Sequence, residues 1–113
     1  MRTNRLGTHA TAIHPIPNGF AIAYHATDIV SVQDIVNAQG IASGKVIRLD
    51  NGGYHTATTK ARMNQAARQF GLPYSVYQEH FQWYIEYNNR AFPFDKTAEI
   101  RIENGKDSII LDA

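Results

Sequence analysis

The stretch between residues 50 and 73 constrains the fold more than any other, because the start, face and end of a helix can be recognised in it. Thr58 or Thr59 can cap the start, since a hydroxyl oxygen accepts one of the backbone N–H groups that lack a partner in the first turn. Gly71 suits the left-handed conformation that ends a helix, and a proline two residues later prevents its continuation. The pattern predicts one helix over residues 59–70.

Apolar side chains recur along this helix at the spacing of a single face. Met63, Ala66, Ala67 and Phe70 lie at i, i+3, i+4 and i+7. A chain of 113 residues is the size of one domain, and such a domain buries about 65% of its unfolded surface. One helix cannot enclose that core alone, so a sheet is expected to form the other wall.

Several segments alternate apolar and polar residues with the two-residue period of β-strands. They cover residues 20–32, 45–49, 54–57, 74–77, 81–87, 91–94 and the two arms around Asn104. In the fifth segment the alternation assigns Phe81, Trp83, Ile85 and Tyr87 to the buried face. Pro93 restricts the sixth segment to a sheet edge. The predicted fold class is α+β, with a mostly antiparallel sheet of five to seven strands packed on the helix.

The most specific sheet prediction is the last hairpin. Asn104 and Gly105 form the dipeptide preferred in two-residue type I′ turns. Folding at this turn sets Glu103 opposite Lys106 and Ile100 opposite Ile109, so that the apolar residues of both strands share a face.

Two segments are harder to assign. Residues 1–18 contain two prolines and follow neither period, so we expect a mobile arm ahead of a single α+β domain at 19–113. Residues 31–39 begin with a serine cap and are followed by a glycine stop, which favours a short second helix, with a strand extension as the alternative.

Composition limits the class of protein. The chain has no cysteine, which excludes disulfides, thiolate metal ligands and thiol nucleophiles. It has neither a continuous apolar signal region nor a run approaching the roughly 18 apolar residues of a membrane helix, so a soluble protein of the cytoplasm is expected. The net charge of +1 is near neutral, but basic residues concentrate between residues 45 and 68.

Motifs for catalysis and metal binding are missing from the sequence. The five histidines lack the close spacing of a zinc site, and no serine lies in a nucleophile-elbow motif. Gly52 and Gly53 do not continue into a phosphate-binding loop, which leaves them as turn residues. We therefore expect no enzymatic activity, metal or cofactor.

The predicted helix carries no acidic residue, and its polar side chains are of the kinds that contact phosphates and base edges. Tyr84 is expected to point away from the core, where it could stack on unpaired bases. The candidate nucleic-acid-binding residues are Lys45, Arg48, Thr58, Thr59, Lys60, Arg62, Asn64, Arg68 and Tyr84. The alternative is an ordinary solvent-exposed helix face.

Two stretches, YHATDIV and VIRLDNGGYHTATTKARMNQ, resemble a pattern of small accessory proteins encoded by bacteriophages. The shared features are a short strand, a Gly/Asn turn before an aromatic residue and a helix entry of the form T-x-T-T-K-x-R-x-N. They are carried here by Tyr24, Thr27, Gly53, Tyr54, Thr56, Thr58, Thr59, Lys60, Arg62 and Asn64. The segment between Val32 and Lys45 departs from the compact version of the pattern. The resemblance implies a phage protein that acts in the bacterial host cytoplasm.

Two functions follow as hypotheses. The first is a nucleic-acid-binding accessory domain that uses the basic helix face, since lysine and arginine side chains bind nucleic acid by neutralising its phosphates. The second is a phage-encoded inhibitor or modulator that binds a host protein complex or defence system through exposed tyrosines. No membrane partner is expected, and the oligomeric state stays open, with a homodimer among the alternatives.

Overall fold

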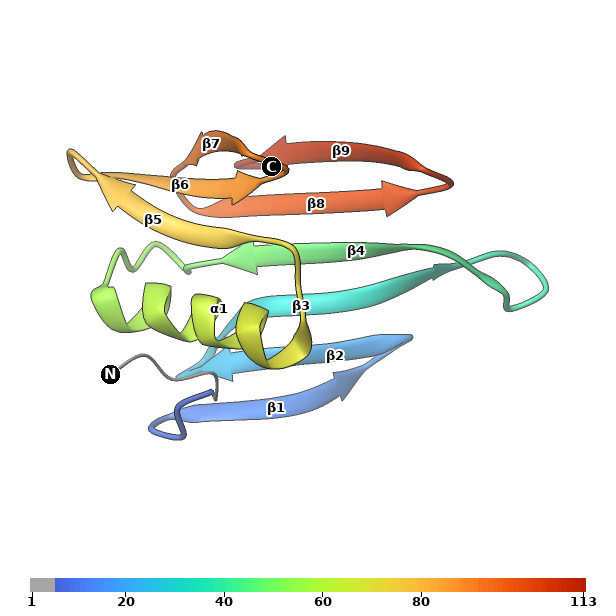
Figure 1. Ribbon diagram of the computed structural model, residues 1–113. Helices are drawn as coiled ribbons and strands as arrows, with labels where there is room; N and C mark the ends of the chain where they lie inside the picture. The colour runs from blue at the N-terminus through green and yellow to red at the C-terminus, as the bar shows by residue number, and fades with distance from the viewer. Residues whose placement is uncertain (1–5) are drawn as a thin grey trace.

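The computed structural model describes residues 6–113, which fold into one helix and nine strands (Figure 1). In chain order these are β1 (Thr11–Ile16), β2 (Gly19–Tyr24), β3 (Thr27–Val36), β4 (Ala42–Asp50), α1 (Ala57–Phe70), β5 (Ser75–Glu79), β6 (Gln82–Tyr87), β7 (Arg90–Phe94), β8 (Thr97–Glu103) and β9 (Lys106–Leu111). The α+β class is confirmed. The strands number nine instead of five to seven, and they divide between two sheets.

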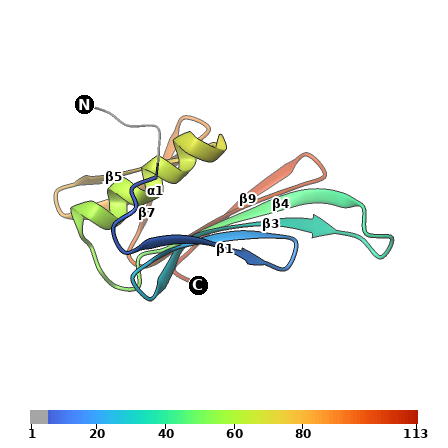
Figure 2. The ribbon, with the colours of Figure 1, turned by 90° about the horizontal axis from the view of Figure 1, so that it is seen from below.

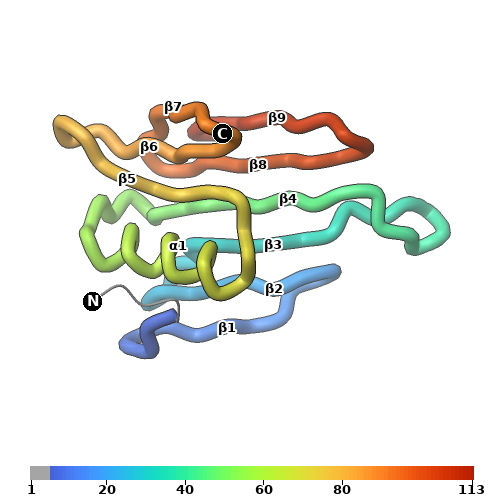
Figure 3. The backbone as a smooth tube through the Cα atoms, in the orientation of Figure 1, coloured from blue at the N-terminus to red at the C-terminus, as the bar shows by residue number. Residues whose placement is uncertain are grey.

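The two sheets are both antiparallel. The larger has six strands in the order β1-β2-β3-β4-β8-β9, and the smaller is a meander of β5, β6 and β7. Helix α1 and the small sheet lie on the same face of the large sheet, so the molecule has two layers (Figure 2). The tube trace shows α1 lying over β2 and β3, with β5 continuing above β4 (Figure 3).

The core lies between these layers. The large sheet contributes an inner face of buried residues, which includes Ile22, Val30, Ile47, Leu49, Ala98 and Ile100. Against it pack Met63, Ala66 and Ala67 of α1 and, from the small sheet, Val76, Trp83, Ile85 and Phe94. The predicted apolar stripe of the helix is therefore confirmed, with Phe70 half-buried at its end.

Both ends of α1 are capped. Gly71 has the predicted left-handed conformation, with φ of 64°. The start differs from the prediction, because Thr56 is the N-cap and its hydroxyl oxygen accepts the backbone N–H of Thr59 at 3.2 Å. Thr58 and Thr59 are thus helical residues, and the helix begins two residues earlier than predicted.

The expectation of an irregular arm over residues 1–18 is wrong for residues 11–16, which form β1 paired with β2. The backbone N–H of Leu6 and Gly7 also donate to the side chains of Gln69 and Gln65, at 2.7 and 2.9 Å. Pro15 does not prevent strand formation, because β1 is an edge strand, where proline is tolerated. Residues 1–5 of the expected arm lie outside the described part of the chain.

Two other expected elements are wrong. Residues 31–39 do not form a second helix, because residues 31–36 continue β3 between β2 and β4, where pairing on both sides overrides a weak helical pattern. Residues 54–57 do not form a returning strand. They belong to a loop and to the start of α1.

Of three predictions for the C-terminal strands, two are confirmed and one is wrong. The last hairpin has the predicted register, with Glu103 opposite Lys106 and Ile100 opposite Ile109. β7 is an edge strand, as Pro93 requires. Phe81, however, is not a core residue of β6: it lies in the preceding turn with φ of 67° and is 94% exposed.

We predict that Phe81→Gly stabilises the folded chain by about 0.5–1 kcal/mol. A bulky residue at positive φ is unfavourable by roughly 1–2 kcal/mol, and glycine removes this penalty at some cost in unfolded-state entropy. Urea denaturation at low protein concentration, where contacts between copies do not contribute, measures the difference. Asn89→Gly is the matched control, because Asn89 has a φ of 62° in the next turn but asparagine tolerates that conformation, so its gain should be smaller.

Candidate functional site

The residues predicted to bind nucleic acid are distributed over several surfaces. Five of them lie on α1, between Thr58 and Asn64, and Arg68 lies in its last turn. Lys45 and Arg48 lie on β4, and Tyr84 lies on β6.

Two of the helix residues are used inside the fold. The side-chain amide of Asn64 donates to the backbone carbonyl of Val76 and its oxygen accepts the Val76 N–H, both at 2.8 Å. Thr59 is buried, and its hydroxyl oxygen lies 2.9 Å from that of Thr56. The first pair attaches α1 to β5, and the second closes the helix start. Neither side chain projects as a contact for nucleic acid.

Lys60 and Arg62 of α1 have neutral partners in the described residues. The Nε of Arg62 donates to the Thr11 hydroxyl at 3.1 Å, and its guanidinium lies 5.9 Å from the centre of the Tyr24 ring. The Nζ of Lys60 lies 3.5 Å from Oε1 of Gln78 on β5. Among residues 6–113, no carboxylate lies within 4 Å of either of these cationic groups. Arg68 is exposed in the last turn, where a positive charge complements the helix dipole.

The two basic residues of β4 do not extend this helix surface. Ile47 and Leu49 face the core, so Arg48 between them projects from the opposite face of the large sheet, where its Nη1 lies 3.8 Å from Oε1 of Glu99. Lys45, opposite Asp34, lies near the start of β4, at the other end of the strand from the one that leads into α1. The structure therefore does not bring Lys45 and Arg48 together with the cations of α1.

Tyr84 lies on the outer face of the small sheet. Its ring stacks on that of Tyr77, with 5.1 Å between centroids and 14° between planes, and Pro93 is its partner on β7. We call Tyr77, Tyr84 and Pro93 the tyrosine face. Burial, and then the nearby carboxylates of Glu79 and Glu86, raise the pKa of Tyr77. The surroundings of this face are thus acidic, which disfavours phosphate.

A cavity of about 540 Å³ lies beside the start of α1, and sequence reasoning missed it. Its walls come from the β2–β3 turn, the loop between β4 and α1, and the first turn of the helix. They are mostly apolar and aromatic, with hydroxyl groups at the helix start, and consist of Tyr24, His25, Ala26, Thr27, Ile29, Asn51, Tyr54, Thr56, Thr58 and Thr59. Six of these residues belong to the phage-type pattern, which was the available signal.

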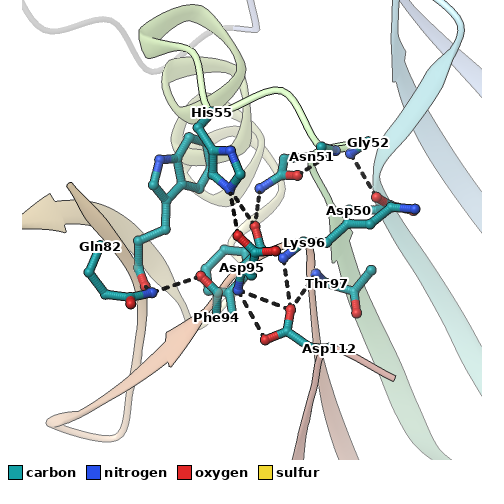
Figure 4. A network of polar contacts seen from close by, with 12 residues as sticks. Asp50, Asn51, Gly52, His55, Gln82, Phe94, Asp95, Lys96, Thr97 and Asp112 are labelled. Carbon is teal, nitrogen blue, oxygen red and sulfur yellow. Dashed lines mark hydrogen bonds and ion pairs between the residues drawn. The ribbon is translucent and has the colours of Figure 1, made fainter.

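The loop beside this cavity is fixed by a network of polar contacts (Figure 4). The buried Asn51 donates its side-chain amide to the backbone carbonyl of Asp95 at 2.9 Å, and Nε2 of His55 lies 2.6 Å from the same oxygen. The carboxylate of Asp112 accepts the backbone N–H groups of Asp95, Lys96 and Thr97 at 2.7–3.2 Å. The network connects the β7–β8 turn to the C-terminal residues and to the cavity wall.

Asp112 should make the stability of the protein sensitive to acid. Burial alone would raise the pKa of its carboxyl, but the hydrogen bonds from the three backbone N–H groups outweigh burial and hold the pKa below its ordinary value. The unfolded state therefore binds the proton more readily, so stability is present above the ordinary pKa and is lost as the pH falls through the lower, folded pKa.

The measurement is urea denaturation at a series of pH values from neutral to strongly acidic. Asp112→Asn should reduce the acid-dependent loss and should destabilise the protein at neutral pH by about 1 kcal/mol, because an amide has only one oxygen to accept the three N–H groups. An unchanged dependence on pH in this variant would contradict the assignment. Asp34→Asn on the exposed part of β3 is the control.

In residues 6–113 no three histidine or acidic side chains lie together in a way that could hold a metal ion. The helix found in that part of the chain is too short and too polar to cross a membrane.

Comparison with known proteins identifies the family. The family model described as Kyanoviridae Gp96 protein matches residues 2–103, which is most of the chain. Neither a curated protein nor a solved structure matches it. The phage origin that the resemblance implied is thus confirmed: the chain belongs to the Kyanoviridae Gp96 protein family, whose members are encoded by cyanophages.

Proposed function

We propose that this phage protein is a non-catalytic accessory protein that acts by binding another protein through its tyrosine face. The observation that carries the proposal is the stacked pair of Tyr77 and Tyr84, extended by Pro93 across all three strands of the small sheet. Tyrosine is enriched at protein interfaces because it combines a large apolar ring with a polar group and loses little side-chain entropy.

The charges around this face support a protein partner over nucleic acid. Glu79 and Glu86 flank the two tyrosines, and among residues 6–113 the nearest ion-pair partner of Glu79 is the exposed His80, at 3.8 Å. Carboxylates repel phosphates but attract lysine and arginine side chains. The expected partner is a protein segment that carries basic residues beside an apolar or proline residue.

The test is a capture experiment from cyanobacterial host lysate with quantitative comparison of variants. Wild-type protein should retain a partner at a stoichiometric level, and Tyr77→Ser with Tyr84→Ser should lose it. Tyr54→Ser is the control, since Tyr54 is an exposed tyrosine that lies beside the cavity and outside the tyrosine face. The proposal is wrong if the double variant and the wild type capture the same proteins in equal amounts, or if the partner fails to bind when purified.

Nucleic-acid binding through α1 is a second candidate, favoured by one observation. The first turn of α1 contains no acidic residue, and no carboxylate of residues 6–113 neutralises Lys60 or Arg62. Fluorescence anisotropy with single- and double-stranded oligonucleotides at low salt tests this function. Binding should weaken steeply with salt and should be lost in Lys60→Glu with Arg68→Glu, but not in Lys45→Glu with Lys106→Glu.

A further inference from the structure

Phe81 is the most exposed large apolar residue found in residues 6–113, and its conformation is unusual. It is 94% exposed at the tip of the β5–β6 turn, and both His80 and Phe81 have positive φ, of 51° and 67°. The corresponding turns between β6 and β7 and between β8 and β9 use Asn88-Asn89 and Asn104-Gly105, which tolerate positive φ. A strained backbone that presents an aromatic side chain to solvent indicates a residue retained for contact with a partner.

The cavity at the start of α1 matches such a side chain. Its volume of about 540 Å³ lies within the roughly 300–1,000 Å³ of sites that enclose small organic groups. Tyr24, Tyr54 and Ile29 supply apolar walls, and the rings suit edge contacts with a phenyl group. Phe81 does not fill the cavity of its own chain, because nearly all of its surface is exposed.

The turn and the cavity lie at the same end of the molecule. Figures 1 and 2 both place the β5–β6 turn at the same end of the molecule as the start of α1 and the loop that precedes it. The 3.5 Å contact between Lys60 in the first turn of α1 and Gln78 near the end of β5 agrees with this arrangement. An isologous interface at this end would contain both features of each copy, as is required for each turn to meet the cavity of the other copy.

Charge complementarity points to the same occupant. Glu79 precedes the turn that presents Phe81, and it would approach the start of α1 in the other copy. That helix start has no acidic residue in its first turn, carries Lys60, and has backbone N–H groups that favour a carboxylate. None of the residues that line the cavity is acidic.

We propose that two copies of this chain form a two-fold dimer in which Phe81 of each copy enters the cavity at the start of α1 of the other. The interface does not include the tyrosine face, so the inference stands independently of the proposed function. Both the Phe81 side chain and the cavity that it enters belong to this chain, so dimer formation requires no other protein.

Sedimentation velocity over a wide range of concentrations of the full chain tests the proposal. Wild-type protein should dimerise reversibly. Phe81→Asn, which suits positive φ, should raise the dimer Kd at least about 30-fold, as expected for the loss of a buried aromatic anchor. Phe81→Tyr should change the Kd by only a few-fold, and Tyr77→Ser with Tyr84→Ser should leave it unchanged.

A second variant tests the cavity. Thr58→Trp places an indole in the cavity from an exposed helix position, so the variant should fold but be monomeric. In a mixture of the two variants, Thr58→Trp still has Phe81 and Phe81→Asn still has an open cavity. The mixture should therefore form a weak heterodimer, although neither variant associates alone.

The outcomes separate the alternatives. A wild-type chain that stays monomeric at every concentration overturns the proposal, and so does a dimer that neither variant weakens. Loss of the dimer in Phe81→Asn but not in Thr58→Trp would place Phe81 against another surface and overturn the assignment of the cavity. A monomeric wild type that uses Phe81 to capture a different protein would show that the turn serves another partner.

Discussion

Replacing Trp83 with alanine is expected to destabilise the protein by about 3–5 kcal/mol. Trp83 is 1% exposed and is among the largest fully buried side chains. The centre of its ring lies 5.9 Å from that of Phe94 and 5.5 Å from that of His55, both in T-shaped geometry, so it connects the small sheet to the loop before α1. Alanine would leave a cavity between the layers, and the loss is comparable to the whole stability of a small domain, about 5–15 kcal/mol.

The measurement is urea denaturation followed by far-ultraviolet circular dichroism, because the variant lacks the single tryptophan of the chain. Trp83→Phe is the matched control. It keeps an aromatic ring and removes an indole N–H that finds no hydrogen-bond partner within residues 6–113, so its cost should stay near 1 kcal/mol. A loss below about 1 kcal/mol in the alanine variant would contradict the central position assigned to Trp83.

The parts of the fold that were predictable from sequence are those whose local signals agree with their tertiary environment. The stripe of α1, the stop at Gly71 and the register about Asn104 and Gly105 each follow from spacing and turn chemistry within a few residues. β1 could not be found in this way. An edge strand pairs on one side only, so its sequence can contain a proline and a polar residue that a central strand would exclude.

Phe81 shows how a periodic pattern can mislead. It continues the alternation of Trp83 and Ile85, and burial of all three was the reasonable prediction. β6 begins at Gln82, one residue later than the pattern implies, because Phe81 occupies a turn position that asparagine or glycine normally holds. Departures of this kind from local rules are expected at functional positions, and the proposed dimer contact lies there.

The candidate site was less predictable than the fold, because a helical wheel gives the direction of a side chain but not its neighbours. Asn64 follows Lys60 by one helical turn and therefore lies on the same side of α1, but the sequence could not show that β5 would lie against that side. The cavity could not be predicted for the same reason, since residues 24–29 and 51–59, two segments far apart in sequence, form it together.

Asn64→Ala is expected to cost about 2–4 kcal/mol of stability, which would separate a structural role for this residue from nucleic-acid contact. Val76 is 3% exposed, and its backbone N–H and C=O both bond to the Asn64 side chain instead of to a neighbouring strand. Alanine would leave both groups buried without a partner, at about 1–3 kcal/mol each. Urea denaturation monitored by Trp83 fluorescence measures the change.

Two further variants test whether the loss of stability in Asn64→Ala comes from the hydrogen bonds to Val76. Asn64→Asp can still accept the Val76 N–H but directs a carboxylate oxygen at the Val76 carbonyl, so it should be as destabilising as alanine at neutral pH. Lys60→Ala, one turn earlier on the same side, removes only a weak exposed contact of 3.5 Å and should change stability by less than about 0.5 kcal/mol. Equal and small effects at both positions would mean that the Asn64 side chain is available to a ligand after all. A large effect confined to Asn64 would assign this side chain to the fold. Lys60, Arg62 and Arg68 would then remain the candidate nucleic-acid-binding residues of the helix.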